Sequence, residues 1–401
     1  MTGRRSTWAE QFFEHFASIP LTAECVYYSP QFLDKGIQKE VCDFLIVLRG
    51  EALLVSMKSQ EDPTKKTGEK LAGWIVKNAG GAFKQAKGAL RTLNSNSFWC
   101  QHRRRGRVAF APRSLKIAHL IVITELFGER VKLPDNLPLV IDDIPVTYLA
   151  VNDFLNLVYE LRTFPDVSAY LNARRGLSAI TLRTVGDERP LFEYYILNKG
   201  SLAGCLGYED ARIMAAANEH NLEMYRQFVA IRDQHAGIIE CVSDRLATRL
   251  DDYAEGLRPE VAAFYDDPAN RKNYLLLQEE LCDLDLAARR AVGMQFTHVI
   301  EKVEKSNEEA PMSFGAAYVD SKPDFVYVLV SARGVTRPEL IKRSNILLRA
   351  AMACYKRPRG MVIAERDGKN FEVQMIAGFT PDEADVQLGE FYFSRLKISD
   401  V

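Results

Sequence analysis

Two consecutive apolar segments constrain the fold of this chain more than any other feature of its sequence. Val41–Arg49 and Ala52–Lys58 are rich in aliphatic residues, and in neither do apolar and polar residues alternate regularly. Strands that are apolar on both faces are typical of the centre of a sheet covered on both sides. The two segments therefore predict a pair of adjacent central strands.

Three polar side chains in these segments would meet if the segments form a hairpin. A two-residue turn at Gly50-Glu51, with glycine at the first position, suits type II′ and would pair Asp43 with Lys58. Ser56 would then lie two residues back on the same face. A bulge or a longer turn would break this register. A structural alternative is an aspartate at a strand start and a lysine that extends to solvent at a strand end.

The rest of the chain predicts a mixed α/β protein, because segments of helical and of strand-like pattern are interspersed. An N-terminal helix over Thr7–Ile19 carries Glu10 and Glu14 on the flank of its apolar stripe. A helix over Lys65–Leu93 is expected in two pieces, broken near Gly80-Gly81. The other elements expected before residue 200 are strands at Ala23–Tyr28, Ala118–Thr124 and Pro145–Leu149, a basic loop at Arg103–Arg107, and helices at Asn152–Leu161 and Phe164–Ala173.

The pattern changes near residues 200 and 310, which predicts three domains over 1–200, 201–310 and 311–401. Helix formers dominate the middle region, which would support dimerisation, bind a protein partner or bridge its neighbours. In the last region we expect a strand at Asp324–Ser331, a helix at Arg337–Cys354 and a hairpin around Asp367-Gly368. Ser331–Gly334 follows that strand, so it is either a simple turn or a loop that binds a small ligand.

Charge is segregated along the chain although the formal net charge is −1. Residues 64–116 hold 13 Lys and Arg but a single acid, Glu69, so the remainder of the chain is acidic. Such an asymmetry predicts one phosphate-facing surface, although a solvated helix face with a basic loop would also explain it. The residues expected to contact phosphates are Lys77, Lys84, Lys87 and Arg91 on one helix face, and Arg103, Arg104 and Arg105 in the loop.

The polar residues of the two central strands and of the helices on either side of them in the sequence resemble the motif of the PD-(D/E)xK nuclease superfamily. The resemblance is in particular to the nuclease-related domains of prokaryotes. The family pattern is a helix with a glutamate, a strand with an aspartate, a strand with an acid two residues before a lysine, and a helix that often carries a glutamine. The matching residues are Glu10 or Glu14, Asp43, Ser56-Met57-Lys58 and Gln85. The sequence departs from the pattern at Ser56, which stands where the second acid is usually found.

The resemblance implies an N-terminal restriction-endonuclease-like mixed-sheet domain, followed by the helical region and a small C-terminal α/β domain. It also implies a metal-dependent endonuclease that hydrolyses DNA, duplex rather than single-stranded, in prokaryotic defence or repair. Asp43 and Glu10 would hold Mg²⁺ or Mn²⁺, Lys58 would position water or stabilise phosphate charge, and Gln85 would steady the site. Ser56 would complete the set of groups around the metal ion. A homo-oligomer would cut both strands of the DNA duplex. The alternative is an inactive nuclease-like protein that binds nucleic acid or acts as a scaffold.

Composition excludes several other classes. With 47% hydrophobic and 26% charged residues, the chain is neither disordered nor fibrous. Its seven cysteines are scattered without a CxxC pair, which predicts reduced thiols in a cytoplasmic protein. No secretory signal is evident, and the apolar run Ile117–Thr124 is far shorter than the roughly 18 residues that cross a bilayer. We expect no membrane partner, and no phosphate-binding motif of a nucleotide-hydrolysing motor occurs.

Overall fold

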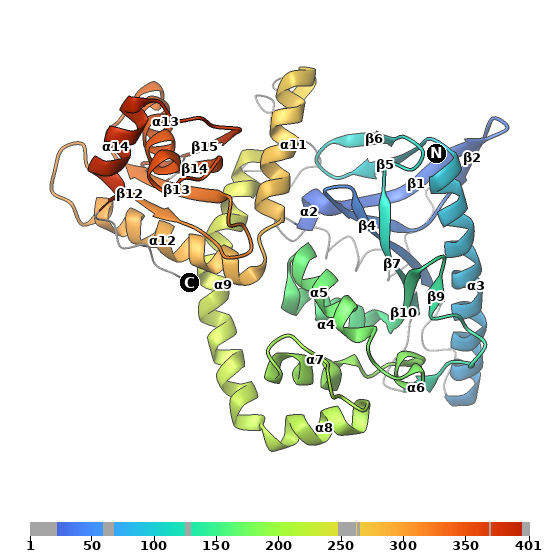
Figure 1. Ribbon diagram of the computed structural model, residues 1–401. Coiled ribbons are helices and arrows are strands. Elements are labelled where there is room, and N and C mark those ends of the chain that lie inside the picture. Colours follow the sequence, from blue (N-terminus) through green and yellow to red (C-terminus); the bar gives the residue numbers. More distant parts are fainter. Residues whose placement is uncertain are drawn as a thin grey trace. The chain divides into compact units, whose positions relative to one another are not determined.

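A computed structural model describes residues 22–58, 68–124, 130–247, 262, 265–368 and 370–394. Its contacts divide the chain into two compact units: Met1–Gln227 with Glu255–Leu257, and Phe228–Ala254 with Arg258–Val401 (Figure 1). This division near residue 227 differs from the predicted boundaries at 200 and 310, because helix α9 (Glu219–Ala247) contributes to both units. The predicted helix over Thr7–Ile19, with Glu10 and Glu14, lies outside the described residues.

The predicted mixed α/β class is confirmed, with a large N-terminal mixed sheet, a helical middle region and a smaller C-terminal sheet. The large sheet has the strand order β6-β5-β1-β3-β4-β7-β10-β9, and β2 pairs with β1 beside this path. Its strands are β1 (Val26–Asp34), β2 (Ile37–Glu40), β3 (Phe44–Leu48), β4 (Glu51–Lys58), β5 (Phe98–His102), β6 (Gly106–Phe110), β7 (Lys116–Thr124), β9 (Val140–Ile141) and β10 (Ile144–Ala150). The strands of the β5–β6 hairpin were not predicted from the sequence.

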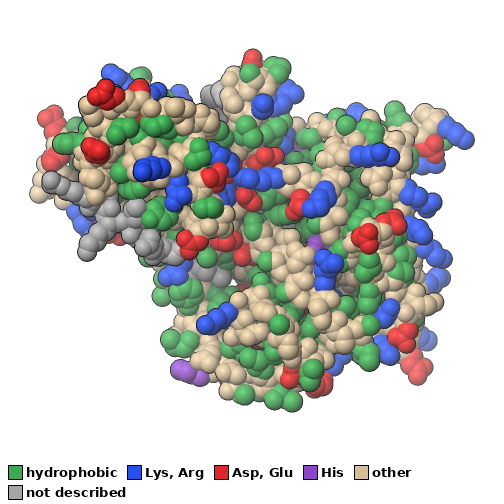
Figure 2. All heavy atoms as spheres, in the orientation of Figure 1, with side chains coloured by type: hydrophobic (Ala, Val, Ile, Leu, Met, Phe, Trp, Pro, Cys, Tyr) green, Lys and Arg blue, Asp and Glu red, His purple; other side chains and the backbone are tan. Residues whose placement is uncertain are grey.

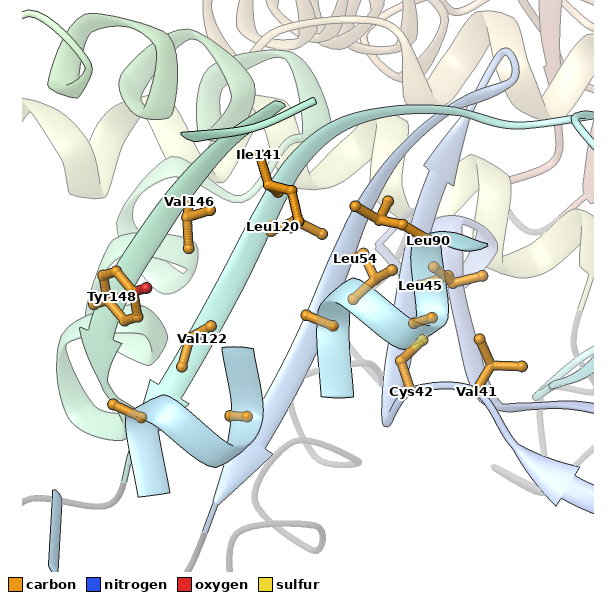
Figure 3. Close-up of a cluster of buried hydrophobic side chains, with 14 of the residues drawn as sticks. Val41, Cys42, Leu45, Leu54, Leu90, Leu120, Val122, Ile141, Val146 and Tyr148 are labelled. Atoms are coloured by element: carbon orange, nitrogen blue, oxygen red, sulfur yellow. The ribbon is translucent and has the colours of Figure 1, made fainter. Parts of the chain in front are cut away.

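The centre of this sheet has the predicted order of elements. Strands β3 and β4 are antiparallel, and β7 runs parallel to β4. The chain passes from β4 to β7 through helix α3 (Gly68–Ser95) and then the β5–β6 hairpin. Alternate side chains of the sheet point toward α3 and form one buried core, in which Leu54, Leu120 and Val122 contribute from adjacent strands (Figure 3). The ends of β4 and β7 therefore lie beneath α3.

The predicted break in the basic helix is wrong, because α3 is one continuous helix of 28 residues. Its buried face carries Leu71, Ile75, Leu90 and Leu93, and burial of such side chains contributes roughly 1.5–3 kcal/mol each. A glycine in a helix interior costs only about 1 kcal/mol. Packing against the sheet thus outweighs the low helix propensity of Gly80-Gly81.

The remaining elements of the first unit are short helices and one small strand pair. Strand β8 (Val131–Lys132) pairs with β11 (Thr184–Val185). The helices are α2 (Thr22–Cys25), α4 (Val151–Leu161), α5 (Phe164–Arg174), α6 (Ala179–Leu182), α7 (Glu188–Leu197) and α8 (Tyr208–Ala217). Helix α2 replaces the start of the strand predicted at Ala23–Tyr28, whereas α4 and α5 lie where helices are predicted.

The second unit contains a four-stranded sheet with the order β12-β13-β14-β15. Helix α13 connects the parallel strands β13 and β14. The predicted strand, helix and hairpin are all present in this unit, and Asp367 and Gly368 have positive φ in the hairpin loop. Its elements are α11 (Pro268–Cys282), α12 (Leu286–Glu304), β12 (Met312–Ala317), β13 (Phe325–Ala332), α13 (Arg337–Cys354), β14 (Arg359–Arg366), β15 (Asn370–Ala377) and α14 (Glu383–Phe393).

Within the ranges that the structure describes, no helix is both long enough and apolar enough to cross a membrane.

The continuity of α3 can be tested with a single glycine. Gly81 is exposed, has helical backbone angles, and a Cβ there would meet no other atom within 4 Å. Gly81→Ala should therefore raise the free energy of unfolding by about 0.5–1 kcal/mol in urea titrations. Gly106→Ala is the matched control: space is equally open there, but φ is +64°, so this change should destabilise. A destabilising effect of Gly81→Ala would contradict the continuous helix.

Candidate active site

The turn between β3 and β4 differs from the predicted one by a residue. Arg49 and Gly50 form the two-residue turn, with φ of 50° and 78°, and Leu48 pairs with Glu51. Positive φ at both central positions is the type I′ turn rather than type II′. The predicted turn at Gly50-Glu51 is therefore wrong, and so is the predicted pairing of Asp43 with Lys58.

The corrected register nevertheless keeps the predicted residues on one face. Phe44 pairs with Val55, so Asp43, which directly precedes β3, comes level with Ser56 instead of Lys58. A shift of two residues preserves the face because side chains alternate with period two. The Asp43 carboxylate also lies close to β4, since its Oδ2 accepts a 2.7 Å hydrogen bond from the backbone N–H of Met57.

Lys58 at the end of β4 is linked to helix α3. Its Nζ donates a 2.7 Å hydrogen bond to Oε1 of Gln85, which lies halfway along α3. Both side chains are partly buried, so the ammonium group is held in one direction by a neutral oxygen. The structure thus brings together Asp43, Ser56, Lys58 and Gln85, four of the five predicted catalytic residues. The fifth, Glu10, lies outside the described residues.

Two hydroxyl groups at this end of the sheet are buried without a hydrogen-bond partner among the residues that the structure describes. They are Ser56 Oγ, in a fully buried side chain, and Thr124 Oγ1 at the end of β7. Thr124 is the register partner of Lys58 in the parallel β4–β7 pair. Buried hydroxyls are normally hydrogen-bonded, so both groups have hydrogen-bonding capacity that the described residues do not use. Sequence reasoning missed Thr124, and its one signal was a polar residue closing an apolar strand.

The donor set at this site fits a divalent cation only in part. Mg²⁺ prefers several oxygen ligands, and the described residues offer the Asp43 carboxylate and the Ser56 hydroxyl. No group of three His, Cys, Asp or Glu side chains suited to an ion occurs in the described portion of the chain. A cation would therefore need a further acid: Glu10, which is the predicted ligand, or alternatively Glu14 or Glu40.

The predicted phosphate-binding residues of α3 form an exposed row. Lys77, Lys84, Lys87 and Arg91 are all exposed, on the face opposite the buried leucines and alanines. Figure 2 shows Lys and Arg side chains along the edge of the molecule where α3 lies. From Lys77 to Arg91 the row is about 21 Å long, a distance over which duplex DNA carries about 12 phosphate charges. We name these four residues the basic row.

The three arginines of the β5–β6 turn do not share one environment. Arg103 is partly exposed, but the side chains of Arg104 and Arg105 are only 4% and 5% exposed. Arg104 donates a 2.8 Å hydrogen bond to the buried Glu24, and Arg105 donates to Tyr27 Oη at 2.8 Å. The predicted phosphate contacts of Arg104 and Arg105 therefore conflict with their structural role, because a guanidinium bound inside a hairpin is not available to DNA.

Glu24 holds this buried cluster together. Burial by itself raises the pKa of Glu24, but Arg104, His102 and Arg105 outweigh burial and lower the pKa to about 2. His102 behaves differently, since burial and the neighbouring Arg105 lower its pKa to about 3. The imidazole is thus neutral, and its Nδ1 accepts the backbone N–H of Arg104 at 3.1 Å.

In the second unit, the loop Ser331–Gly334 is closed by its own hydrogen bonds. Ser331 Oγ donates to Glu365 Oε2 at 2.7 Å, and the Gly334 N–H donates to Asp367 Oδ1 at 3.0 Å. The main-chain and side-chain groups that a ligand would use are thereby engaged in joining β13 to β14. This arrangement favours the turn over the ligand loop.

Comparisons with known proteins add no assignment: no family model, no curated protein and no solved structure matches this chain.

Acidification should destabilise the first unit through His102 and Glu24. The unfolded chain binds protons at these groups below their ordinary pKa values of 6.5 and 4.5, whereas the folded chain binds them only near 3 and 2. Stability should therefore be retained above about pH 6.5 and lost progressively as the pH falls toward 2. Urea unfolding at several pH values in that range measures this loss.

The control variants separate the two groups. His102→Gln should reduce the loss that begins near pH 6.5, and the part that remains comes from His119, whose pKa burial lowers to about 4. Glu24→Gln should remove the loss that begins near pH 4.5, and this variant should be less stable by about 3–5 kcal/mol because the buried arginines lose their counter-ion. Glu69→Gln, at an exposed position on α3, should leave the pH profile unchanged. A wild-type profile in both buried variants would contradict the assignment.

Proposed function

We propose that this protein is a metal-dependent nuclease that hydrolyses phosphodiester bonds in DNA. The observation that carries the proposal is the Lys58–Gln85 hydrogen bond of 2.7 Å at the end of β4, the strand to which the Asp43 carboxylate is bonded through the N–H of Met57. A carboxylate and an oriented ammonium at one end of two rigid strands are the groups that phosphoryl chemistry requires. The exposed basic row on the same helix as Gln85 supports a polyanionic substrate.

Each residue has a distinct role in this proposal. Asp43 and Glu10 hold Mg²⁺ or Mn²⁺, and Ser56 contributes its hydroxyl in place of a second acid. When bound, such an ion polarises a phosphoryl oxygen and makes a bound water more acidic. Lys58 orients that water or stabilises charge on the phosphate, and Gln85 keeps the ammonium in position.

The substrate we propose is duplex DNA, bound through its backbone. The basic row offers charges at three-, four- and seven-residue spacing and no side-chain pattern that reads bases. A homo-oligomer would cut both strands, and a prokaryotic defence or repair setting in the cytoplasm agrees with the family resemblance. These parts of the proposal rest on that resemblance.

A second candidate function is nucleic-acid binding without cleavage, within a larger complex. Ser56 favours it, because a hydroxyl is a weaker cation ligand than a carboxylate. In this case the basic row would bind DNA, and the site around Asp43 and Lys58 would no longer be catalytic. Activity measurements distinguish the two candidates.

Removal of the site residues should abolish cleavage but not binding. Asp43→Ala and Lys58→Ala should each lower the rate of plasmid and linear-duplex cleavage in Mg²⁺ or Mn²⁺ by about 10²–10³-fold. Gln85→Ala should have a smaller effect, of about tenfold, because Gln85 acts through Lys58. The measurement is the fraction of DNA cut as a function of time, and reactions that contain EDTA define the background.

A matched pair of surface residues provides the control. Lys132 and Asp135 are exposed in the same unit and lie 3.9 Å apart, so Lys132→Ala and Asp135→Ala should leave cleavage unchanged. Cleavage that persists unaltered in Asp43→Ala and Lys58→Ala would contradict the assignment of these residues to the active site. DNA binding with no cleavage by any form of the protein would favour the second candidate.

The basic row should govern the salt dependence of DNA binding. Replacing Lys77, Lys84, Lys87 and Arg91 by Gln should weaken binding and lower the slope of log K against log salt by about 3–4. Fluorescence anisotropy of a labelled duplex at several salt concentrations measures the slope. As a control, glutamine is introduced at four exposed lysines of the second unit: Lys272, Lys302, Lys305 and Lys342. An equal loss in both variants would show that net charge alone is responsible.

A further inference from the structure

A cleft of about 260 Å³ lies between α4, α7 and α9 within the first unit. Much of its lining is apolar or aromatic: Leu157, Tyr159, Phe192, Ile196, Leu222 and Tyr225. The other seven lining residues are polar or charged: Asp153, Asn156, Glu160, Glu188, Arg189, Glu193 and Arg226. A concave site that combines apolar surface with polar groups is the usual form of a small-molecule site. The polar groups therefore decide which chemistry it would accept.

Asp153 is the carboxylate in this lining that lacks a cation. Its Oδ2 accepts a 3.1 Å hydrogen bond from the N–H of Gly186, and the carboxylate also accepts the backbone N–H of Glu188. No ion pair of Asp153 with Lys, Arg or His occurs among the described residues. Neighbouring Glu188 forms an ion pair with Arg174, at 2.6 Å. Burial, together with repulsion from Glu188, raises the pKa of Asp153 to about 6. A positive charge placed in the cleft would relieve this repulsion.

The arginines of the same lining are already engaged, which argues against an anionic ligand. Arg189 donates to Glu193 Oε1 at 2.9 Å, and Arg226 donates to the same oxygen at 3.3 Å. Phenylalanine and tyrosine rings, by contrast, attract cations through their π faces. Charge and lining thus favour a cation attached to an apolar body.

We propose that this cleft binds an organic ammonium compound with an apolar or aromatic body, and that Asp153 pairs with the ammonium group. The ligand lies against Phe192, Tyr225 and the aliphatic side chains of α4 and α9. This site is independent of the proposed nuclease site, since none of its residues belongs to β3, β4 or α3.

The test uses three probes of similar size that differ in charge: 2-phenylethylamine, neutral 2-phenylethanol and anionic 3-phenylpropionate. Calorimetric titration of the full chain near neutral pH should give about tenfold or greater preference for the amine. Equal binding of the alcohol or the acid would overturn the proposal. So would amine binding weaker than about 1 mM.

Variants then assign the effect to Asp153. Asp153→Asn keeps an oxygen that can accept the Gly186 N–H, and it should lower the affinity for the amine about tenfold or more while the melting temperature stays close to that of the wild type. Asp135→Asn, at an exposed position of the same unit, is the control and should bind normally. In the wild type, affinity should fall as the pH drops below about 6, a dependence that Asp153→Asn should lose. Unchanged affinity in Asp153→Asn would refute the role of Asp153.

Discussion

The packing of α3 across β4 and β7 is the interaction on which the first unit depends. The inner face of the helix consists of leucine, isoleucine and alanine, and the small residues Ala79, Ala82 and Ala86 are fully buried. Because this face must lie on the sheet, the lysines at the intervening positions point to solvent. Gln85 lies at the border between the two faces, where its side chain reaches Lys58. The packing of α3 on the sheet therefore positions both the basic row and the candidate active site.

Buried charge at the β5–β6 hairpin is the second constraint. A carboxylate as deeply buried as Glu24 is stable only with cationic partners, and it takes Arg104 and Arg105 from a run of three consecutive arginines. Residues that are alike and adjacent in sequence consequently have different roles. Arg103 remains partly exposed, while its two neighbours hold a hairpin to the start of β1.

Much of the fold was predictable because its signals are local. Apolar runs and helical periodicity identified β4, β7, β10, α4, α5 and α13, and glycine placed the β14–β15 turn. The errors came from interactions between distant segments. The break at Gly80-Gly81 was expected from propensity alone, which packing overrides, and the register of β3 and β4 depends on a turn whose positive φ at Arg49 no local rule favours. The error in the β3–β4 register left the predicted site residues together, because a shift of two residues keeps side chains on the same face of the sheet.

By itself, the sequence determined the mixed α/β class, the central strand pair and the concentration of positive charge in residues 64–116, since each follows from residue type and spacing. Only the tertiary structure decided that Lys58 bonds to Gln85, that Thr124 lies beside them, and that Arg104 is internal. It also revealed Asp153 in a cleft between three helices. These relations join residues far apart in sequence or select among identical neighbours. Their free energies depend on burial and on the partner at hand, neither of which is encoded in local pattern.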